Sequence, residues 1–285
     1  MQSLANIEPV DYLIIGNLTQ DLTPQGAFLG GTASYSALTA KALGLRVGIV
    51  TSCAAELQLP ELEGIQVLVH PAEHTTTFEN IYTPAGRIQY IHNSALRLDI
   101  SMVPDRWRNT PIVHLGPIAN EVDPALAAAF PNSLVGLTIQ GWFRGWDGDH
   151  RVHYRPWSEA RTTLQNANAA VMSVEDVENN ENQIEEFQAY VPILAVTEGA
   201  TGARLFWKGD QRRFRPPRMK ETDPVGAGDI FATAFFYRLR QTQDPWEAAG
   251  FATKLAAYSV TRSGLHGIPT PSEVESCMVE IISRA

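Results

Sequence analysis

This 285-residue chain has few cysteines, no long apolar run and no excess of positive charge. Its two cysteines, Cys53 and Cys277, fit no metal or redox spacing and predict free thiols of a reducing compartment. No apolar run approaches the length of a membrane span and no signal peptide is evident, so we expect a cytoplasmic protein. A net charge of -9 and a pI near 5.3 disfavour nucleic acid and anionic membranes as partners.

Two common nucleotide-binding motifs are missing as well. The chain has no G-x-x-x-x-G-K-[ST], and Phe231 stands where a dinucleotide fingerprint would need its third glycine.

Residues 70–74, HPAEH, match the H-x-x-E-H pattern of a zinc peptidase group. Pro71 and the strand-like flanks exclude the single helical face that those ligands require, so we reject a zinc site.

Short apolar runs alternate with helical patterns along the chain, and 44% of the residues are hydrophobic. This pattern predicts an α/β fold with one domain over residues 1–285. Buried strands are predicted at residues 11–15, 46–51, 111–115, 134–139, 169–172 and 193–198, with hairpins at 75–92 and 203–214. Helices are predicted at residues 32–44, 123–130, 229–239 and 245–264.

The stretch 223–239, DPVGAGDIFATAFFYRL, predicts a tight glycine turn that opens a buried helix. Gly226 and Gly228 permit positive φ angles, and the free N–H groups of a helix start attract anions. Asp229 lies in the same turn and is suited to accept a proton from an attacking hydroxyl. An ordinary strand-to-helix turn capped by Asp is the alternative. Anion cradle and base together predict phosphoryl transfer, with Gly226, Ala227, Gly228 and Asp229 as the catalytic group.

The sequence DPVGAGD resembles the second signature of the ribokinase/PfkB carbohydrate kinase family, D-T-x-G-A-G-D, with Pro224 in place of Thr. The resemblance extends over five segments in the family's order. It implies a ribokinase-like three-layer sandwich with a mostly parallel central sheet flanked by helices, and a small β lid around residues 75–95. It also implies an ATP-dependent kinase, assisted by Mg²⁺, that phosphorylates a hydroxyl of a small sugar or polyol.

The first half of the chain resembles the part of the family that holds the acceptor. An Asp near the first strand and a Gly-Gly pair would contact acceptor hydroxyls, although a glycine hinge with a capping Asp is the stand-alone alternative. Tyr35 stands where the family commonly has Asn, and the pieces GGTASY and TTTF look closer to the inositol kinase branch. The acceptor residues implied by the resemblance are Thr19, Asp21, Gly30, Gly31, Tyr35, Gln140 and Arg144.

The second half resembles the family's donor side. The residues implied to hold ATP are Ser173, Thr197, Gly199, Gly202, Gly226, Gly228, Ala252, Thr253 and Ala256. Asp176 and Glu175 are implied to hold Mg²⁺ through water, while a helix cap at Ser173 is the structural alternative. Asp223 and the Val225 carbonyl are implied to hold a monovalent cation such as K⁺, and Pro224 weakens that expectation because it removes a hydroxyl and an N–H.

Other functions remain open at this point. A nucleoside is the alternative acceptor, and a non-catalytic sugar or nucleotide sensor on the same fold is the alternative class. The basic cluster at residues 212–220 is interpreted as a solvated strand edge whose end approaches the phosphates. A two-stranded lid has edges that invite pairing, so we also expect a homodimer through the lid.

Overall fold

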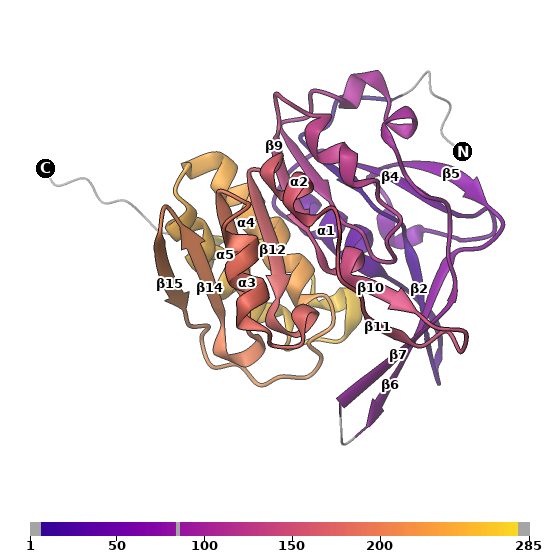
Figure 1. The fold of residues 1–285 in the computed structure, drawn as a ribbon. Helices are drawn as coiled ribbons and strands as arrows, with labels where there is room; N and C mark the ends of the chain where they lie inside the picture. Colours follow the sequence, from indigo (N-terminus) through magenta and orange to yellow (C-terminus); the bar gives the residue numbers. More distant parts are fainter. Residues whose placement is uncertain (1–6, 84–85, 279–285) are drawn as a thin grey trace, which may run out of the picture.

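The computed structural model describes residues 7–83 and 86–278. Its centre is a nine-stranded sheet with the order β15-β14-β13-β12-β9-β8-β1-β4-β5 (Figure 1). In this spatial order, all strands from β13 to β5 run parallel to one another. At the opposite edge, β14 and β15 are antiparallel to their neighbours. These strands are β1 (Tyr12–Ile15), β4 (Val47–Ala54), β5 (Gln66–Ala72), β8 (Ile112–Leu115), β9 (Leu134–Thr138), β12 (Ala169–Ser173), β13 (Ile193–Thr197), β14 (Ala203–Trp207) and β15 (Asp210–Phe214).

Helices cover both faces of this sheet because its strands are apolar on both sides. In β1, Tyr12 and Ile14 pack into the core under α1 (Gly31–Ala42), α4 (Ala227–Thr242) and α5 (Pro245–Ser259). Leu13 and Ile15 point the other way, into the core that includes residues of α2 (Ala160–Gln165) and α3 (Glu181–Gln188). The last helix is α6 (Pro271–Cys277), which packs on α5. This arrangement confirms the predicted three-layer α/β fold.

A smaller sheet projects from the carboxyl side of the main sheet, at the lower right of Figure 1. It contains β2 (Thr19–Thr23), β3 (Gly26–Gly30), β6 (Thr76–Thr83) and β7 (Gly86–Asn93), in the order β3-β2-β6-β7. Phe78 and Ile91 anchor it against Ile118 and Ala119 of the body. A short ribbon of β10 (Arg144–Trp146) and β11 (Val152–Tyr154) joins it through a bridge between Tyr90 and Arg151.

Three sequence predictions need correction. Residues 19–30, for which no strand was predicted, form the β2–β3 hairpin, so the small sheet has four strands and not the two of the predicted 75–92 hairpin. The helix expected at 123–130 is only a short 3₁₀ segment at Pro124–Ala128. The long helix expected to stop at Gly264 ends at Ser259, before a further 3₁₀ turn. The tip of the β6–β7 hairpin, predicted at residues 83–86, lies partly outside the described residues.

Among the residues that the structure describes, no helix is both long and apolar enough to cross a lipid bilayer.

Candidate active site

A cavity of about 740 Å³ opens where the parallel strands end and the small sheet overhangs them. Ligands of open α/β sheets bind at this edge, because the carboxyl ends of the strands deliver their loops there. Most of the predicted site residues line it. They are Thr19, Asp21, Gly31, Tyr35, Gln140, Arg144, Ser173, Glu175, Asp176, Thr197, Gly199, Gly202, Val225, Gly226, Ala227, Gly228, Asp229, Thr253 and Ala256.

Three predicted residues lie outside the cavity lining. Gly30 packs against the carboxylate of Asp21, where a Cβ would overlap it. Ala252 is fully buried in the core on the inner face of α5, so its predicted contact with the nucleotide is wrong. Its neighbours Thr253 and Ala256 do reach the cavity, because successive residues of a helix point in different directions. Asp223 is treated below.

The glycine turn forms the predicted helix start. Gly226 is the N-cap of α4 in the left-handed region, with φ of +79°, and Ala227 begins the helix. The Ala227 N–H donates to the Pro224 carbonyl and the Ile230 N–H to the Gly226 carbonyl, so the N–H groups of Gly228 and Asp229 are the ones available to an anion in the cavity. The α4 helix has 16 residues, so its dipole adds partial positive charge at this turn. The turn is therefore suited to bind an anion.

Asp229 lies in the first turn of α4 and reaches the cavity with a partly exposed side chain. Burial raises the pKa of Asp229 to about 6, while a hydrogen bond from Thr32 and the charge of Arg144 oppose that rise. The nearby carboxylates of Asp176 and Asp21 raise it further. A carboxylate whose pKa lies near 6 is ionised at neutral pH and is still a competent proton acceptor.

Arg144 supplies buried positive charge beside Asp229. Arg144 is only 9% exposed, and its guanidinium donates to the Ile118 carbonyl at 2.8 Å. The guanidinium also lies 5.3 Å from the centre of the Phe78 ring, which belongs to the small sheet. These contacts fix a cation between the small sheet and the base, where phosphoryl oxygens would carry negative charge.

The acidic pair predicted to hold Mg²⁺ is also a helix cap. Asp176 accepts the Ser173 N–H at 2.7 Å and the Gln140 side-chain amide at 2.7 Å, and Ser173 accepts the Glu175 N–H. No group of three or more acidic, His or Cys side chains among the described residues gathers around one point. The residues therefore fit an ion that keeps most of its waters and arrives with the donor phosphates.

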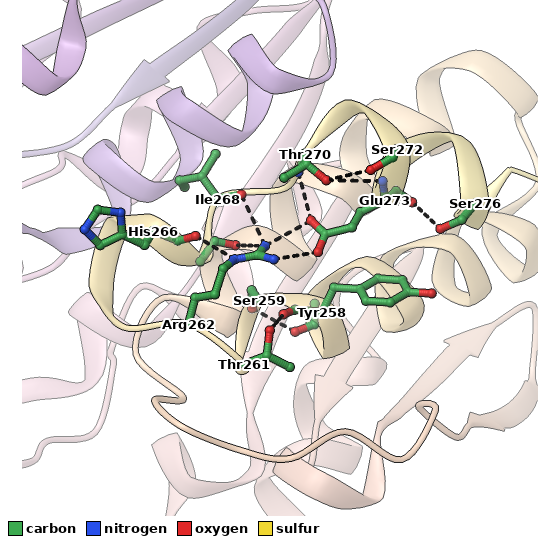
Figure 2. Close-up of polar contacts among 12 residues, drawn as sticks. Tyr258, Ser259, Thr261, Arg262, His266, Ile268, Thr270, Ser272, Glu273 and Ser276 are labelled. Carbon is green, nitrogen blue, oxygen red and sulfur yellow. Dashed lines mark hydrogen bonds and ion pairs between the residues drawn. The ribbon is translucent and has the colours of Figure 1, made fainter.

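The predicted monovalent site is largely satisfied by the chain itself. The two carboxylate oxygens of Asp223 accept the N–H groups of Val225 at 3.0 Å and of Gly264 at 2.8 Å. Pro224 adds no hydroxyl. The Arg262 guanidinium pins the loop that carries Gly264, because it donates to the carbonyls of residues 266–268 and to the Glu273 carboxylate (Figure 2). The residues fit a monovalent cation poorly.

The side of the cavity that the resemblance assigns to the phosphate donor, called the donor wall below, combines the loop 197–202 with small and apolar residues. Gly199 and Gly202 both adopt positive φ, and the Glu198 N–H closes the loop on the Gly202 carbonyl. Arg204 and Arg213 hold the Glu198 carboxylate on the outside of this loop. Pro216 packs against Gly202 of this loop. The apolar lining of this part of the cavity consists of Pro216, Pro217, Met219, Ala256, Ala257 and Val260. The slot between them is suited to a flat apolar ring.

The basic residues at the predicted strand edge are exposed to solvent, as expected, and two of them also make side-chain contacts. Arg212 stacks on Trp246 at 4.2 Å and Arg213 pairs with Glu198, both on β15. Arg218 lines the cavity and is exposed, and the expected approach of this cluster to the phosphates stays a prediction.

Several residues of the site escaped the sequence analysis. The cavity lining also includes Thr32, Phe78 and Thr138. Thr32 directly follows the Gly-Gly pair, and this position was the available signal. Glu121 had no signal: it is buried and accepts N–H groups of Asn17, Ile118 and Ala119, which ties together the loops after β1 and β8. Burial raises the pKa of Glu121, and those N–H bonds lower it.

Comparisons with known proteins confirm the resemblance. A family model described as pfkB family carbohydrate kinase matches residues 158–272. The chain is 36% identical over 72 residues to an inositol 3-kinase of Oryza sativa subsp. japonica, a segment that is 25% of this chain and 18% of that one. It is 24% identical over 192 residues to a fructokinase of Escherichia coli, covering 60% and 62% of the two chains. The matched segments thus span less than two thirds of each relative's length.

Solved structures share the fold over nearly the whole chain. A pyrophosphate-dependent kinase of the ribokinase family, complexed with a pyrophosphate analog and myo-inositol, superimposes with a TM-score of 0.75 at 18% identity and covers 93% of this chain and 99% of that one. The ribokinase of Arabidopsis thaliana, complexed with ribose and ATP, gives a TM-score of 0.75 at 17% identity, with 95% and 99% covered. The ribokinase-like fold predicted from the sequence is confirmed.

Proposed function

Starting from this kinship with the ribokinase/PfkB kinases, we propose that the chain transfers the γ-phosphoryl group of ATP to a hydroxyl of a small sugar or polyol. The observation that carries the proposal is Asp229, which faces the cavity from the first turn of α4 beside the glycine cradle, with its pKa raised to about 6. A base and an anion cradle within one helix turn are the two parts that phosphoryl transfer to a hydroxyl requires.

In this mechanism the acceptor hydroxyl lies between Asp229 and the terminal phosphorus of the donor. As its oxygen attacks phosphorus, the proton passes to the Asp229 carboxylate. The bond from phosphorus to the bridging oxygen breaks, and ADP leaves with that electron pair. The N–H groups of the cradle and the Arg144 guanidinium balance the negative charge of the transferring group. Mg²⁺, held through water by Asp176 and Glu175, supplies further charge neutralisation when bound.

The acceptor side has the chemistry of a polyol pocket. Asp21, Asn80, Gln89 and Gln140 line it with carboxylate and amide groups, which match ring hydroxyls in both donor and acceptor roles. The Thr19 hydroxyl is fully buried and has no hydrogen-bond partner among the described residues. A buried hydroxyl normally has a partner, and a hydroxyl of the acceptor would provide it. An inositol-like ring therefore fits, and a nucleoside is the alternative.

For the donor we favour a nucleotide over pyrophosphate. The slot between the Thr197–Gly202 loop and α5 is lined by proline, methionine and alanine side chains, which suit a purine better than a small tetra-anion. The Thr253 hydroxyl in this wall is also buried and has no hydrogen-bond partner in the described part of the chain. The pyrophosphate-dependent relative makes pyrophosphate the specific alternative.

A donor and acceptor screen tests the proposal. Purified protein with Mg²⁺ is given ATP or pyrophosphate and a panel of sugars, polyols and nucleosides, and product is followed by ADP or phosphate release and by phosphorus NMR. We expect turnover with ATP and one class of polyol or sugar. The variant Ala256→Phe should raise the KM for ATP and leave any reaction with pyrophosphate unchanged, because only a purine needs that slot. Binding without turnover would instead identify a sensor.

Three further expectations stay predictions. A homodimer through the small sheet is tested by light scattering, with the edge strand β3 as the pairing surface. Activation by a monovalent cation at Asp223 and Val225 is tested by comparing rates in K⁺ and in tetramethylammonium. A cytoplasmic location is tested by fractionation of the source cells.

A further inference from the structure

We infer that Tyr35 is a positioning residue for the donor anion cradle. The sequence resemblance assigned it to the acceptor, but its ring is directed at the glycine turn of α4. The inference rests on the proposed function only in taking the cradle at Gly226 as the place where a donor anion binds.

The first contact joins Tyr35 to the cradle itself. Tyr35 lies in the second turn of α1, is 3% exposed and lines the cavity. A Cβ placed on Gly226 would overlap the Cδ1 and Cε1 atoms of the Tyr35 ring. The ring therefore lies directly on the Gly226 backbone. Gly226 has a φ of +79°, a conformation that strains residues with a side chain. It also leaves room for the Tyr35 ring, which any Cβ at this position would displace.

The second contact joins Tyr35 to the loop after α5. A Cβ on Gly264 would lie 3.9 Å from the Tyr35 hydroxyl oxygen. Gly264 in turn donates its N–H to Asp223, three residues before Gly226. The loop is held from its other side by Arg262, as Figure 2 shows. Tyr35 thus fills the space between the Gly226 turn and the Gly264 turn. The hydrogen bond from the Gly264 N–H to Asp223 already connects these two segments.

The consequence is a preorganised cradle. The N–H groups at the start of α4 bind an anion well only if the Gly226 turn keeps its conformation before the anion arrives. The ring meets that turn through its carbon atoms, which restrict the turn, while the hydroxyl group lies at the Gly264 side. Thr32, one turn before Tyr35 on α1, contacts Asp229, so one helix positions both the base and the cradle.

Anion binding by Tyr35 variants tests this role without requiring turnover. Calorimetry measures the affinity of wild type, Tyr35→Ala, Tyr35→Leu and Tyr35→Phe for a non-hydrolysable ATP analogue and for pyrophosphate. We expect Tyr35→Ala and Tyr35→Leu to weaken both anions by roughly tenfold, because the ring that restricts the turn is lost. Tyr35→Phe should stay within about threefold of wild type, since the ring remains. Acceptor KM should change by less than about threefold in all three.

Tyr237→Ala is the matched control. Tyr237 is a buried tyrosine on α4 that packs on Phe251 and does not line the cavity. It should lower the melting temperature as Tyr35→Ala does and leave anion affinity unchanged. Unchanged anion affinity in both Tyr35→Ala and Tyr35→Leu would overturn the inference, as would an equal loss in Tyr237→Ala.

A double-mutant cycle with Gly226→Ala gives a second measurement. In wild type the new methyl group meets the Tyr35 ring, whereas in the Tyr35→Ala background it meets open space. We expect Gly226→Ala to weaken anion binding several-fold less in that background, and additive effects would contradict the contact. Wild type that binds the anions but phosphorylates no acceptor would overturn the proposed function alone. Wild type that binds neither anion would overturn both.

Discussion

The two walls of the cavity differ in how they present polar groups. The acceptor wall buries them: Thr19, Thr32 and Arg144 are all less than 10% exposed, and the last two are held by partners in the protein. The donor wall also holds one buried hydroxyl, that of Thr253, but consists mainly of a loop exposed at Gly199, the exposed Arg218 and the apolar slot. Buried polar groups tolerate little change, because a buried group that is left without its hydrogen-bond partner destabilises the protein or the complex. We therefore expect specificity to reside in the acceptor wall and tolerance in the donor wall.

The family match follows the same division. It covers the part of the chain that builds the donor wall and the catalytic turn, and it leaves out the segments that supply Thr19, Asp21 and Phe78. A cradle made of backbone N–H groups can be encoded by a few glycines, whereas side chains that match one acceptor must differ between enzymes with different acceptors.

Asp229→Asn should have the largest effect, because the proposed base is required for the transfer step between donor and acceptor. We expect kcat to fall by roughly 10³-fold, since the amide cannot accept the proton while the cradle remains. Affinities for donor and acceptor should stay within a few-fold of wild type, measured by calorimetry. Asp149→Asn, an exposed Asp, is the control and should keep full activity. Full activity of Asp229→Asn would remove the assigned base.

Arg144→Gln tests the buried charge of the acceptor wall. We expect kcat/KM to fall by roughly 10- to 100-fold, because one charge-assisted donor to the phosphoryl group is lost. In wild type, kcat/KM should rise with pH and level off above about 6, where Asp229 is ionised. Because Arg144 lowers the pKa of Asp229, the variant's profile should level off at a higher pH. Arg155→Gln, an exposed arginine, should leave the profile in place.

Much of this division was predictable from local patterns. The apolar runs predicted the strands of the main sheet, and the stretch from Asp223 to Asp229 predicted the helix start, because glycine spacing and helix geometry act over a few residues. The Ser173 cap was predicted too, since a cap needs only its own first turn.

The missed parts depend on distant contacts. The β2 strand pairs in parallel with β6, so Thr19 lies opposite Thr76, and the exposed residues between Thr19 and Gly30 show no core pattern of their own. Glu121 is satisfied by backbone groups that include the N–H of Asn17, more than a hundred residues away. The direction of Tyr35 depends on where α4 starts beside α1, which no spacing in the sequence specifies.

Two buried hydroxyls sharpen the comparison because they have the same chemistry on opposite walls. Thr19→Val should raise the acceptor KM by roughly tenfold and leave the donor KM unchanged, since a substrate hydroxyl loses its partner in a buried site. Thr253→Val should raise the donor KM by only about threefold, because apolar residues make most of the lining around it and retain their contacts with the donor. Steady-state kinetics with each substrate varied in turn measures both. Equal effects of the two variants would contradict the division.

The smallest expected effect concerns stability and its pH dependence. The pKa of Asp229 is raised in the folded protein, so between about pH 4 and pH 6 the folded state binds more protons than the unfolded state. Its ionisation therefore lowers the free energy of unfolding as the pH rises through this window. Because the side chain is partly exposed, we expect a loss on the order of 1 kcal/mol and not the full value of the shift.

Asp229→Asn removes this ionisation, and its stability relative to wild type should thus increase from pH 4 to pH 7. Urea unfolding of both proteins at several pH values measures the difference and cancels the contributions of all other groups. Asp149→Asn should show no such trend. A stability difference that stays constant with pH would mean that burial imposes no free-energy penalty on the Asp229 carboxylate. The raised pKa of Asp229, on which its proposed role as the base depends, would then be wrong.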